Sequence, residues 1–249
     1  MSLFRTASQS LADGDRLEVA GAVVTLKINR RARRVSLRLD RTRRQIIATA
    51  PSARRLTEAA AFARERAGWI AQRLAELPQA SPLHPGMTIQ VFGEPVRLET
   101  ALGRARWIEA DGPEPHRICA MGEGEGYARA VMLMIRKRAL LVLSARTAHY
   151  AARLGVPMPS VAVADPKARW GSCRAGRGGA PGAIRYSWRL ALAPFAVADY
   201  VAAHECAHLL EANHGPRFWA HVKALVGDPA PHRSWLRAEG GRLHAFGGR

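Results

Sequence analysis

The residues with the clearest chemical potential are His204-Glu205-Cys206-Ala207-His208, an HExxH pattern. On a helix, residues four apart lie on one face, so the two imidazoles could share one metal ion. Glu205 then stands about 100° round the helix from His204, where it can accept a proton from a metal-bound water without being a ligand. The spacing predicts a zinc hydrolase site with Glu205 as the catalytic base.

A catalytic zinc site has three protein ligands and one open position, so one more ligand must follow the motif. Glu211 would share the metal face if the helix continued beyond His208. His214 would reach the metal only if the chain turned, and Asn213 with Gly215-Pro216 is typical of a helix end followed by a new helix. This turn favours His214 as the third ligand and leaves Glu211 as a carboxylate that supports a ligand.

Other side chains could contact the substrate. Arg169 and Arg217 could bind a carboxylate, a phosphate or an oxyanion, and Tyr186 could donate a hydrogen bond to an oxyanion. The sequence does not distinguish Tyr186 from three similar candidates, Tyr200, His221 and His232. The competing interpretation of the two arginines is that they lie on a solvated surface. For Cys206, Phe218 and Trp219 we favour packing in the core over a direct functional role.

The elements that must position these residues follow from apolar periodicity. The first three expected strands, the last of which ends at Ala50, should form an antiparallel meander, because the links between them are short. The strand at 184–190 could also serve as an edge that pairs with an extended peptide. The order of strands first and helices later predicts an α+β fold, with an N-terminal antiparallel sheet and helix region followed by a small catalytic core. The expected strands are 24–28, 35–39, 45–50, 161–164 and 184–190, with a hairpin at 88–99, and the expected helices are 54–77, 127–154, 194–212 and 216–226.

This pattern also suggests how the chain is divided. We expect a linker at 79–86, where proline and glycine are frequent. The expected regions are a flexible N-terminus at 1–19, a basic β-rich region at 20–125, a catalytic region at 126–240 and a loose tail at 241–249.

The composition excludes wholesale disorder, since 48% of the 249 residues are apolar and 23% are charged. The net charge of +18 is high, and the segment Lys27–Arg55 holds eleven basic residues and one acid. Such a segment could bind an anionic partner such as nucleic acid. It lacks aromatic residues for base stacking, and we favour a solvated face.

The three cysteines form no CxxC pattern, which argues against a disulfide framework or a zinc ribbon. The first sixteen residues have no apolar run typical of a secretory signal. The most apolar stretch, residues 131–143, contains three basic residues, so no membrane span is expected. We expect a cytoplasmic protein.

Three segments resemble the YgjP-like metallopeptidase family, also called DUF45: ARWGSC at 168–173, IRYSWRL at 184–190 and DYVAAHECAHLLEANHGPRFW at 199–219. The similarity extends over about residues 27–237, more weakly through RRARRVSLRL at 30–39 and AFARERAGWIAQRL at 61–74. The resemblance implies a zincin-like core with zinc on His204, His208 and His214, and Glu205 as catalytic acid–base. Gly215 stands where the family often has serine.

Three functions therefore compete. The favoured one is a zinc metallopeptidase that cleaves a peptide or protein with a zinc-bound water activated by Glu205. The alternative is a metal-dependent nucleoside-triphosphate pyrophosphatase or phosphohydrolase, a role that has been proposed within the family, with the arginines holding the phosphates of a nucleotide. The third is a basic nucleic-acid-binding module with a structural metal. Glu205 and the lack of a clear fourth ligand count against it.

Overall fold

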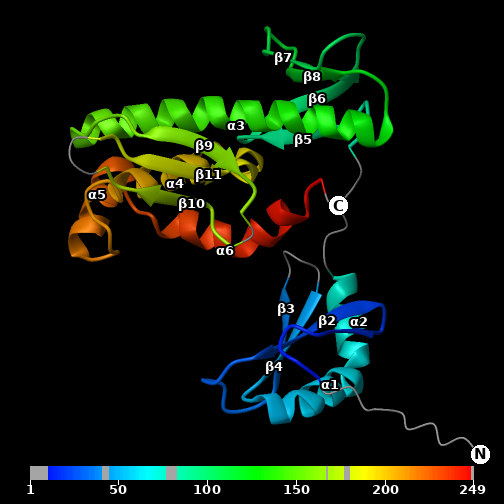
Figure 1. Ribbon diagram of the computed structural model, residues 1–249. Helices are drawn as coiled ribbons and strands as arrows, with labels where there is room; N and C mark the ends of the chain where they lie inside the picture. The colour runs from blue at the N-terminus through cyan, green and yellow to red at the C-terminus, as the bar shows by residue number, and fades with distance from the viewer. Residues whose placement is uncertain (1–10, 41–44, 77–82, 167, 177–179, 248–249) are drawn as a thin grey trace, which may run out of the picture. The chain divides into compact units, whose positions relative to one another are not determined.

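The computed structural model describes residues 11–40, 45–76, 83–166, 168–176 and 180–247 (Figure 1). Contacts divide the chain into two compact units, unit 1 at Met1–Gln79 and unit 2 at Ala80–Arg249. Both units combine sheets with helices, which confirms the α+β class. Within the described ranges, no helix is both long and apolar enough to cross a membrane.

The division between the units differs from the boundary expected near residue 125. It falls after Gln79, at the start of the expected linker 79–86, of which residues 79–82 lie outside the described residues. Buried residues between 83 and 120 share one core with the helices that follow, so this strand-rich segment is part of unit 2. The segment 1–19, expected to be flexible, contains strand β1, and its residues 1–10 lie outside the description.

The sheet of unit 1 has the order β1-β2-β4-β3, formed by β1 (Arg16–Val19), β2 (Ala22–Ile28), β4 (Gln45–Ala50) and β3 (Ser36–Asp40). The predicted meander is wrong, because β4 lies between β2 and β3 and runs parallel to β2. The links are too short for a direct crossover between the parallel strands β2 and β4. Instead β3, which is antiparallel to β4, returns the chain to the end of the sheet where β4 begins. The central place suits β4, since four of its residues are buried and none of the residues of β3 is.

Helices cover this sheet and complete a core that belongs to unit 1 alone. The predicted helix 54–77 is broken at Arg66 into α1 (Leu56–Glu65) and α2 (Ala67–Ala75), after a short 3-10 turn η1 (Ala53–Arg55). The buried side chains that hold the helices to the sheet include Leu26, Ile46, Leu56 and Ile70.

The basic segment Lys27–Arg55 is a surface feature of unit 1. Arg30, Arg31, Arg33 and Arg34 are exposed, while Arg41, Arg43 and Arg44 lie outside the described residues. Arg55 pairs with Glu58 at 2.5 Å. Exposed charges are expected both for a solvated face and for a face that binds an anion, so the choice between them stays a prediction.

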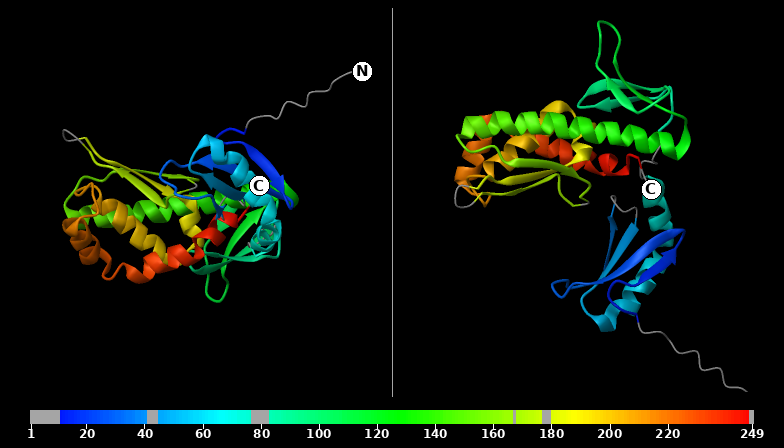
Figure 2. Two further views of the ribbon diagram at one scale, coloured as in Figure 1. Left: turned by 90° about the horizontal axis from the view of Figure 1, so that it is seen from below. Right: turned by 45° about the horizontal axis from the view of Figure 1, so that its top comes forward.

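Unit 2 is built along one long helix, α3 (Gly124–Leu154). In the views of Figures 1 and 2, α3 runs the length of the unit, with one sheet near its N-terminal half and the second sheet and α4 alongside it. The first sheet has the order β5-β6-β8-β7, and the second has the order β10-β11-β9. The bounds are β5 (Thr88–Val91), β6 (Glu94–Thr100), β7 (Arg106–Ile108), β8 (His116–Ala120), β9 (Ser160–Ala164), β10 (Gly171–Arg174) and β11 (Ala183–Ser187), followed by η2 (Trp188–Leu192), α4 (Phe195–Ala207), α5 (Pro216–Val226) and α6 (Ala230–Ala245).

The strand expected at 184–190 as a peptide-binding edge is a central strand. It is β11, which ends at Ser187 and lies between β10 and β9, antiparallel to the first and parallel to the second. Both of its edges are therefore occupied within the chain, and the expectation of an edge strand there is wrong. The edge strands of this sheet are β10 and β9.

The C-terminal segment is fastened to the core by a buried cation. Arg189, only 4% exposed, donates to the carbonyl oxygens of Leu243 at 2.8 Å and Phe246 at 2.9 Å, and pairs with Asp165 at 2.7 Å. The ring of Trp170 also stacks on His244, with centroids 4.8 Å apart. The segment 241–249, expected to be loose, thus carries the last turns of α6, and its residues 248–249 lie outside the description.

Candidate metal centre

The HExxH helix is shorter than the sequence predicted. Helix α4 ends at Ala207, and His208 follows as its C-cap residue with helical backbone angles. The next residues form a turn, in which the amide of Leu210 bonds to the carbonyl oxygen of Ala207 at 3.1 Å. Because α4 ends at Ala207, Glu211 does not lie on the helix face that carries His204 and His208.

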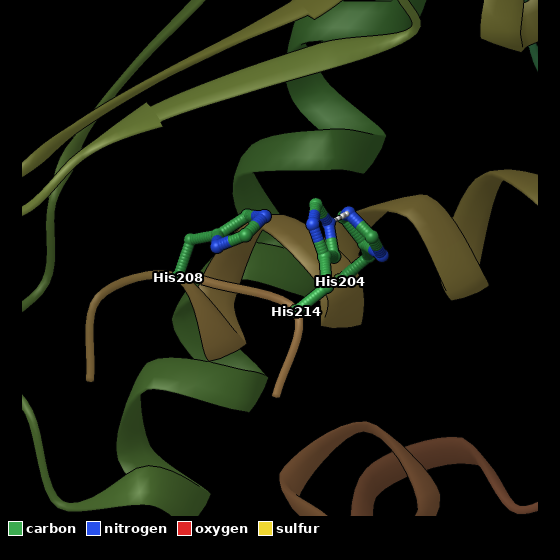
Figure 3. Close-up of side chains that lie close together, drawn as sticks. All are labelled: His204, His208 and His214. Carbon is green, nitrogen blue, oxygen red and sulfur yellow. Dashed lines mark hydrogen bonds between the residues drawn. The ribbon is translucent and has the colours of Figure 1, made fainter. Parts of the chain in front are cut away.

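The chain then returns toward α4 through the turn expected at Asn213. Gly215 is the N-cap of α5, and Pro216 occupies its first turn. This path brings His214 back to the motif, with its Nε2 3.1 Å from Nε2 of His204 (Figure 3). The ligand atoms of His204, His208 and His214 all lie within 4.8 Å of one another.

This arrangement fits a metal ion chemically. Tetrahedral zinc with nitrogen ligands needs ligand atoms about 3.4 Å apart, close to the separation of the two Nε2 atoms. Nδ1 of His208 lies 2.9 Å from the carbonyl oxygen of Glu211, a contact that orients the ring and leaves its Nε2 free. The support expected from the carboxylate of Glu211 thus comes from its backbone.

An aromatic wall holds the three imidazoles in place. The buried ring of Phe218 lies 4.5 Å from the ring of His208, 4.7 Å from that of His214 and 4.8 Å from that of His204. Trp219 is half-buried, and its ring lies 5.8 Å from that of His214. Phe218 is a core residue, as favoured from the sequence, and it also limits the rotamers of all three histidines.

Burial decides the protonation states. The pKa of His204 falls to about 4, first because the ring is buried and then because His208, His214 and Arg233 repel a positive charge on it. Burial likewise lowers the pKa of His214, with further contributions from His208 and Arg233. The neutral imidazole is the form that binds a metal, so these shifts favour the metal-binding form of His204 and His214.

Glu205 lies beneath the backbone of β10 and is 6% exposed. A Cβ atom added at Gly171 would lie 2.4 Å from its Oε1, so only glycine leaves room for this carboxylate. Burial raises the pKa of Glu205 to about 7, against the opposing effect of the Arg169 charge. A carboxylate with a pKa near neutrality can both accept and return a proton.

The three candidate substrate contacts have different fates. Arg169 is exposed, and its charge acts on Glu205. Arg217 is exposed on the first turn of α5, three residues after His214. Tyr186 is fully buried, with its hydroxyl 2.9 Å from Oγ1 of Thr147, so it is not available to a substrate. The reason is its place on the central strand β11, one face of which packs into the core.

Two residues that the sequence left open as candidates, Tyr200 and His232, lie at the centre together with Arg233, which the sequence did not suggest. The hydroxyl of Tyr200 is 3.4 Å from Nδ1 of His204, and its ring stacks on His232 at 5.6 Å. Arg233 lies over the ring of Trp219 at 4.9 Å. The i, i+4 spacing from Tyr200 to His204 is a signal that could have been used. His232 and Arg233 come from α6, and no local pattern connects them with the motif.

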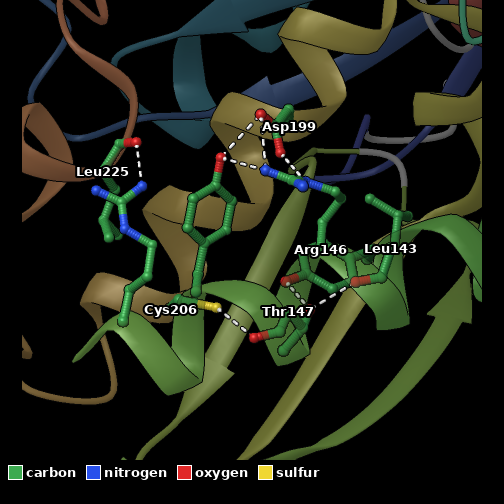
Figure 4. A network of polar contacts seen from close by, with 9 residues as sticks. Leu143, Arg146, Thr147, Asp199, Cys206 and Leu225 are labelled. Atoms are coloured by element: carbon green, nitrogen blue, oxygen red, sulfur yellow. Dashed lines mark hydrogen bonds and ion pairs between the residues drawn. The ribbon is translucent and has the colours of Figure 1, made fainter. Parts of the chain in front are cut away.

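The first half of α4 is fixed to α3 by an ion pair (Figure 4). Nε of Arg146 donates to Oδ1 of Asp199 at 2.5 Å, and the Tyr150 hydroxyl donates to Oδ2 at 2.8 Å. Arg146 also donates to the Tyr150 hydroxyl at 3.1 Å. Asp199 lies five residues before His204, so this network sets the position of the helix that carries His204.

We therefore expect Asp199→Ala to lower the free energy of unfolding of unit 2 by about 2–3 kcal/mol, because it leaves a partly buried guanidinium without its carboxylate. Chemical denaturation followed by fluorescence measures this change. The control is Glu58→Ala, which removes the exposed partner of Arg55 in unit 1 and should leave the free energy of unfolding nearly unchanged. Equal losses in the two variants would show that the network contributes no more than a surface pair.

Comparison with known proteins adds one finding to this geometry. Residues 33–239 match the family model described as YgjP-like, metallopeptidase domain. Searches of the curated proteins and of the solved structures found no match. The matched range spans most of both units and includes all three histidines and Glu205.

Proposed function

The chain belongs to the YgjP-like metallopeptidase family, and from this membership we propose that it is a zinc-dependent peptidase that uses the histidine centre. The observation that carries the proposal is the convergence of three imidazoles, one of which directly precedes a buried carboxylate in the chain. His204, His208 and His214 would hold the ion, and Glu205 would perform the proton transfers. Three protein ligands leave a coordination position open, as in catalytic sites.

The roles of the residues follow from their surroundings. A zinc ion held by the three histidines would lower the pKa of a water toward about 7 and polarise the scissile carbonyl. Glu205 would accept the proton of that water as the water attacks the carbonyl carbon. The same carboxyl group would then give the proton to the leaving amine. The Tyr200 hydroxyl, 3.4 Å from His204, would hold that ring in its rotamer.

Strand β10 offers the place for an extended peptide. It is an edge strand, and its first residue, Gly171, lies directly over Glu205. An extended chain that adds to such an edge makes main-chain hydrogen bonds without depending on its side chains. A peptide paired with β10 would bring one of its carbonyl groups close to Glu205. This position replaces the edge that the sequence suggested at 184–190.

The proposal predicts that metal removal abolishes peptide cleavage. The zinc-loaded protein is incubated with casein and with quenched fluorescent peptides, before and after treatment with 1,10-phenanthroline. We expect cleavage by the loaded protein, loss of cleavage after chelation, and recovery when zinc is restored in excess of the chelator. Release of pyrophosphate from nucleoside triphosphates without any peptide cleavage would contradict the proposal and favour the nucleotide hydrolase.

A further inference from the structure

The first turn of α6 forms part of the wall of the metal centre. Its residue Arg233 places its guanidinium over the ring of Trp219, 4.9 Å from the centroid. The same indole ring lies 5.8 Å from the ring of His214 and 6.1 Å from that of His204. Trp219 thus acts as a platform that carries a cation next to two of the three proposed ligands.

Arg233 forms no ion pair with a carboxylate among the described residues, in contrast to the arginines that fasten the fold of unit 2. Arg138, Arg146 and Arg189 each pair with an acidic side chain and support the fold. Arg233 is exposed, so its donors face solvent. Stacking on an indole restricts a guanidinium while leaving its N–H groups available to an anion.

Arg233 also follows a residue that packs toward His204. Its neighbour His232 stacks on the ring of Tyr200 with centroids 5.6 Å apart, and the Tyr200 hydroxyl lies 3.4 Å from Nδ1 of His204. An exposed guanidinium that forms no ion pair with a carboxylate among the described residues can bind an anion that reaches this wall. The natural source of that anion is the substrate.

We propose that Arg233 is a specificity-determining residue that binds a carboxylate of the peptide substrate beside the metal centre. The carboxylate is either the free C-terminus of the peptide or an acidic side chain next to the scissile bond. One planar guanidinium matches one carboxylate through two parallel hydrogen bonds. A triphosphate carries several negative charges and would need a cluster of cations here. This inference rests on the proposed peptidase function.

The kinetic test compares Arg233→Ala with two other variants on matched peptides. One peptide pair differs only in a free or amidated C-terminus, and a second pair has Glu or Gln beside the scissile bond. For the carboxylate-bearing member of one pair, Arg233→Ala should raise KM about 10- to 100-fold, while its neutral counterpart is unaffected. Arg233→Lys should recover part of the loss, because it keeps the charge without the planar fork.

Arg237→Ala is the matched control, since it removes a second exposed cation one turn further along α6. It should leave both members of each pair unchanged. Equal losses on charged and neutral peptides in Arg233→Ala would assign it a structural role and overturn the proposal. Unchanged kinetics on all four peptides would overturn it as well. The pair that responds identifies the source of the carboxylate.

A binding experiment decides the role of Arg233 even if no peptide is cleaved. Calorimetry measures the affinity of the zinc-loaded protein for N-acetyl-L-alanine, for its carboxamide and for inorganic phosphate. The parent should prefer the carboxylate to the carboxamide, and Arg233→Ala should lose that preference. Lack of any preference in the parent, or an Arg233-dependent preference for phosphate over carboxylate, would overturn the proposal. Absence of peptide cleavage would instead reject the peptidase function and leave this comparison valid.

Discussion

Glu205→Gln should bind zinc as tightly as the parent protein and lose peptide hydrolysis by about 10²- to 10⁴-fold. The amide has nearly the size of the carboxylate and fits the same space beneath Gly171. It cannot accept the proton of the attacking water, so the chemical step slows while the three imidazoles are untouched. Turnover on the cleaved peptides and metal content by mass spectrometry are the two measurements.

The matched control for this variant is Glu211→Gln. Glu211 supports His208 through its backbone carbonyl oxygen, so a change in its side chain should leave both activity and metal content unchanged. If Glu205→Gln turns over peptides as fast as the parent, Glu205 has no part in the mechanism. If it loses metal as well as activity, the carboxylate acts on the ligand set and not as the base.

His214→Ala should lose metal affinity by about 100-fold or more, because two imidazoles on one helix cannot complete a three-ligand site. His214 follows α4 in the chain after a turn, and this turn brings its Nε2 to 3.1 Å from Nε2 of His204. The stabilisation that zinc gives to the folded protein should fall in parallel. Competition with a chromophoric chelator measures the affinity, and thermal unfolding with and without zinc measures the stabilisation.

His84→Ala is the control, since His84 is an exposed histidine of unit 2 outside the three-histidine cluster. It should bind zinc like the parent. Full zinc affinity in His214→Ala, together with its loss in Glu211→Ala, would replace the histidine by the carboxylate as third ligand.

Local patterns in the sequence were sufficient for the parts of the site that lie close together along the chain. Helical spacing predicted that His204 and His208 share a face, and the Asn213 to Pro216 segment predicted the turn that returns His214 to them. The structure has the helix start at Pro216 and brings the three rings together. The helical spacing and the turn both depend on the backbone preferences of a few consecutive residues, so they can be predicted from the local sequence.

Features that depend on which elements become neighbours were not predictable in this way. The alternation in β3 and β4 correctly indicated strands, but it does not say that β4 inserts beside β2. The alternation in β11 could not show that both edges of the strand are occupied or that Tyr186 faces the core. Arg233 reaches the centre because α6 packs against α4, a contact between distant segments that leaves no periodic signal.

The hydrogen bonds from Arg189 to the C-terminal segment affect the order in which the two units can fold during synthesis on the ribosome. A buried guanidinium that lacks its acceptors is costly, and two of those acceptors are the carbonyl groups of Leu243 and Phe246. Unit 1 closes its own core with residues up to Leu74 and can fold during translation. Unit 2 lacks these acceptors until Phe246 has been synthesised, so we expect the nascent chain to bind a metal only after Phe246 has left the ribosome.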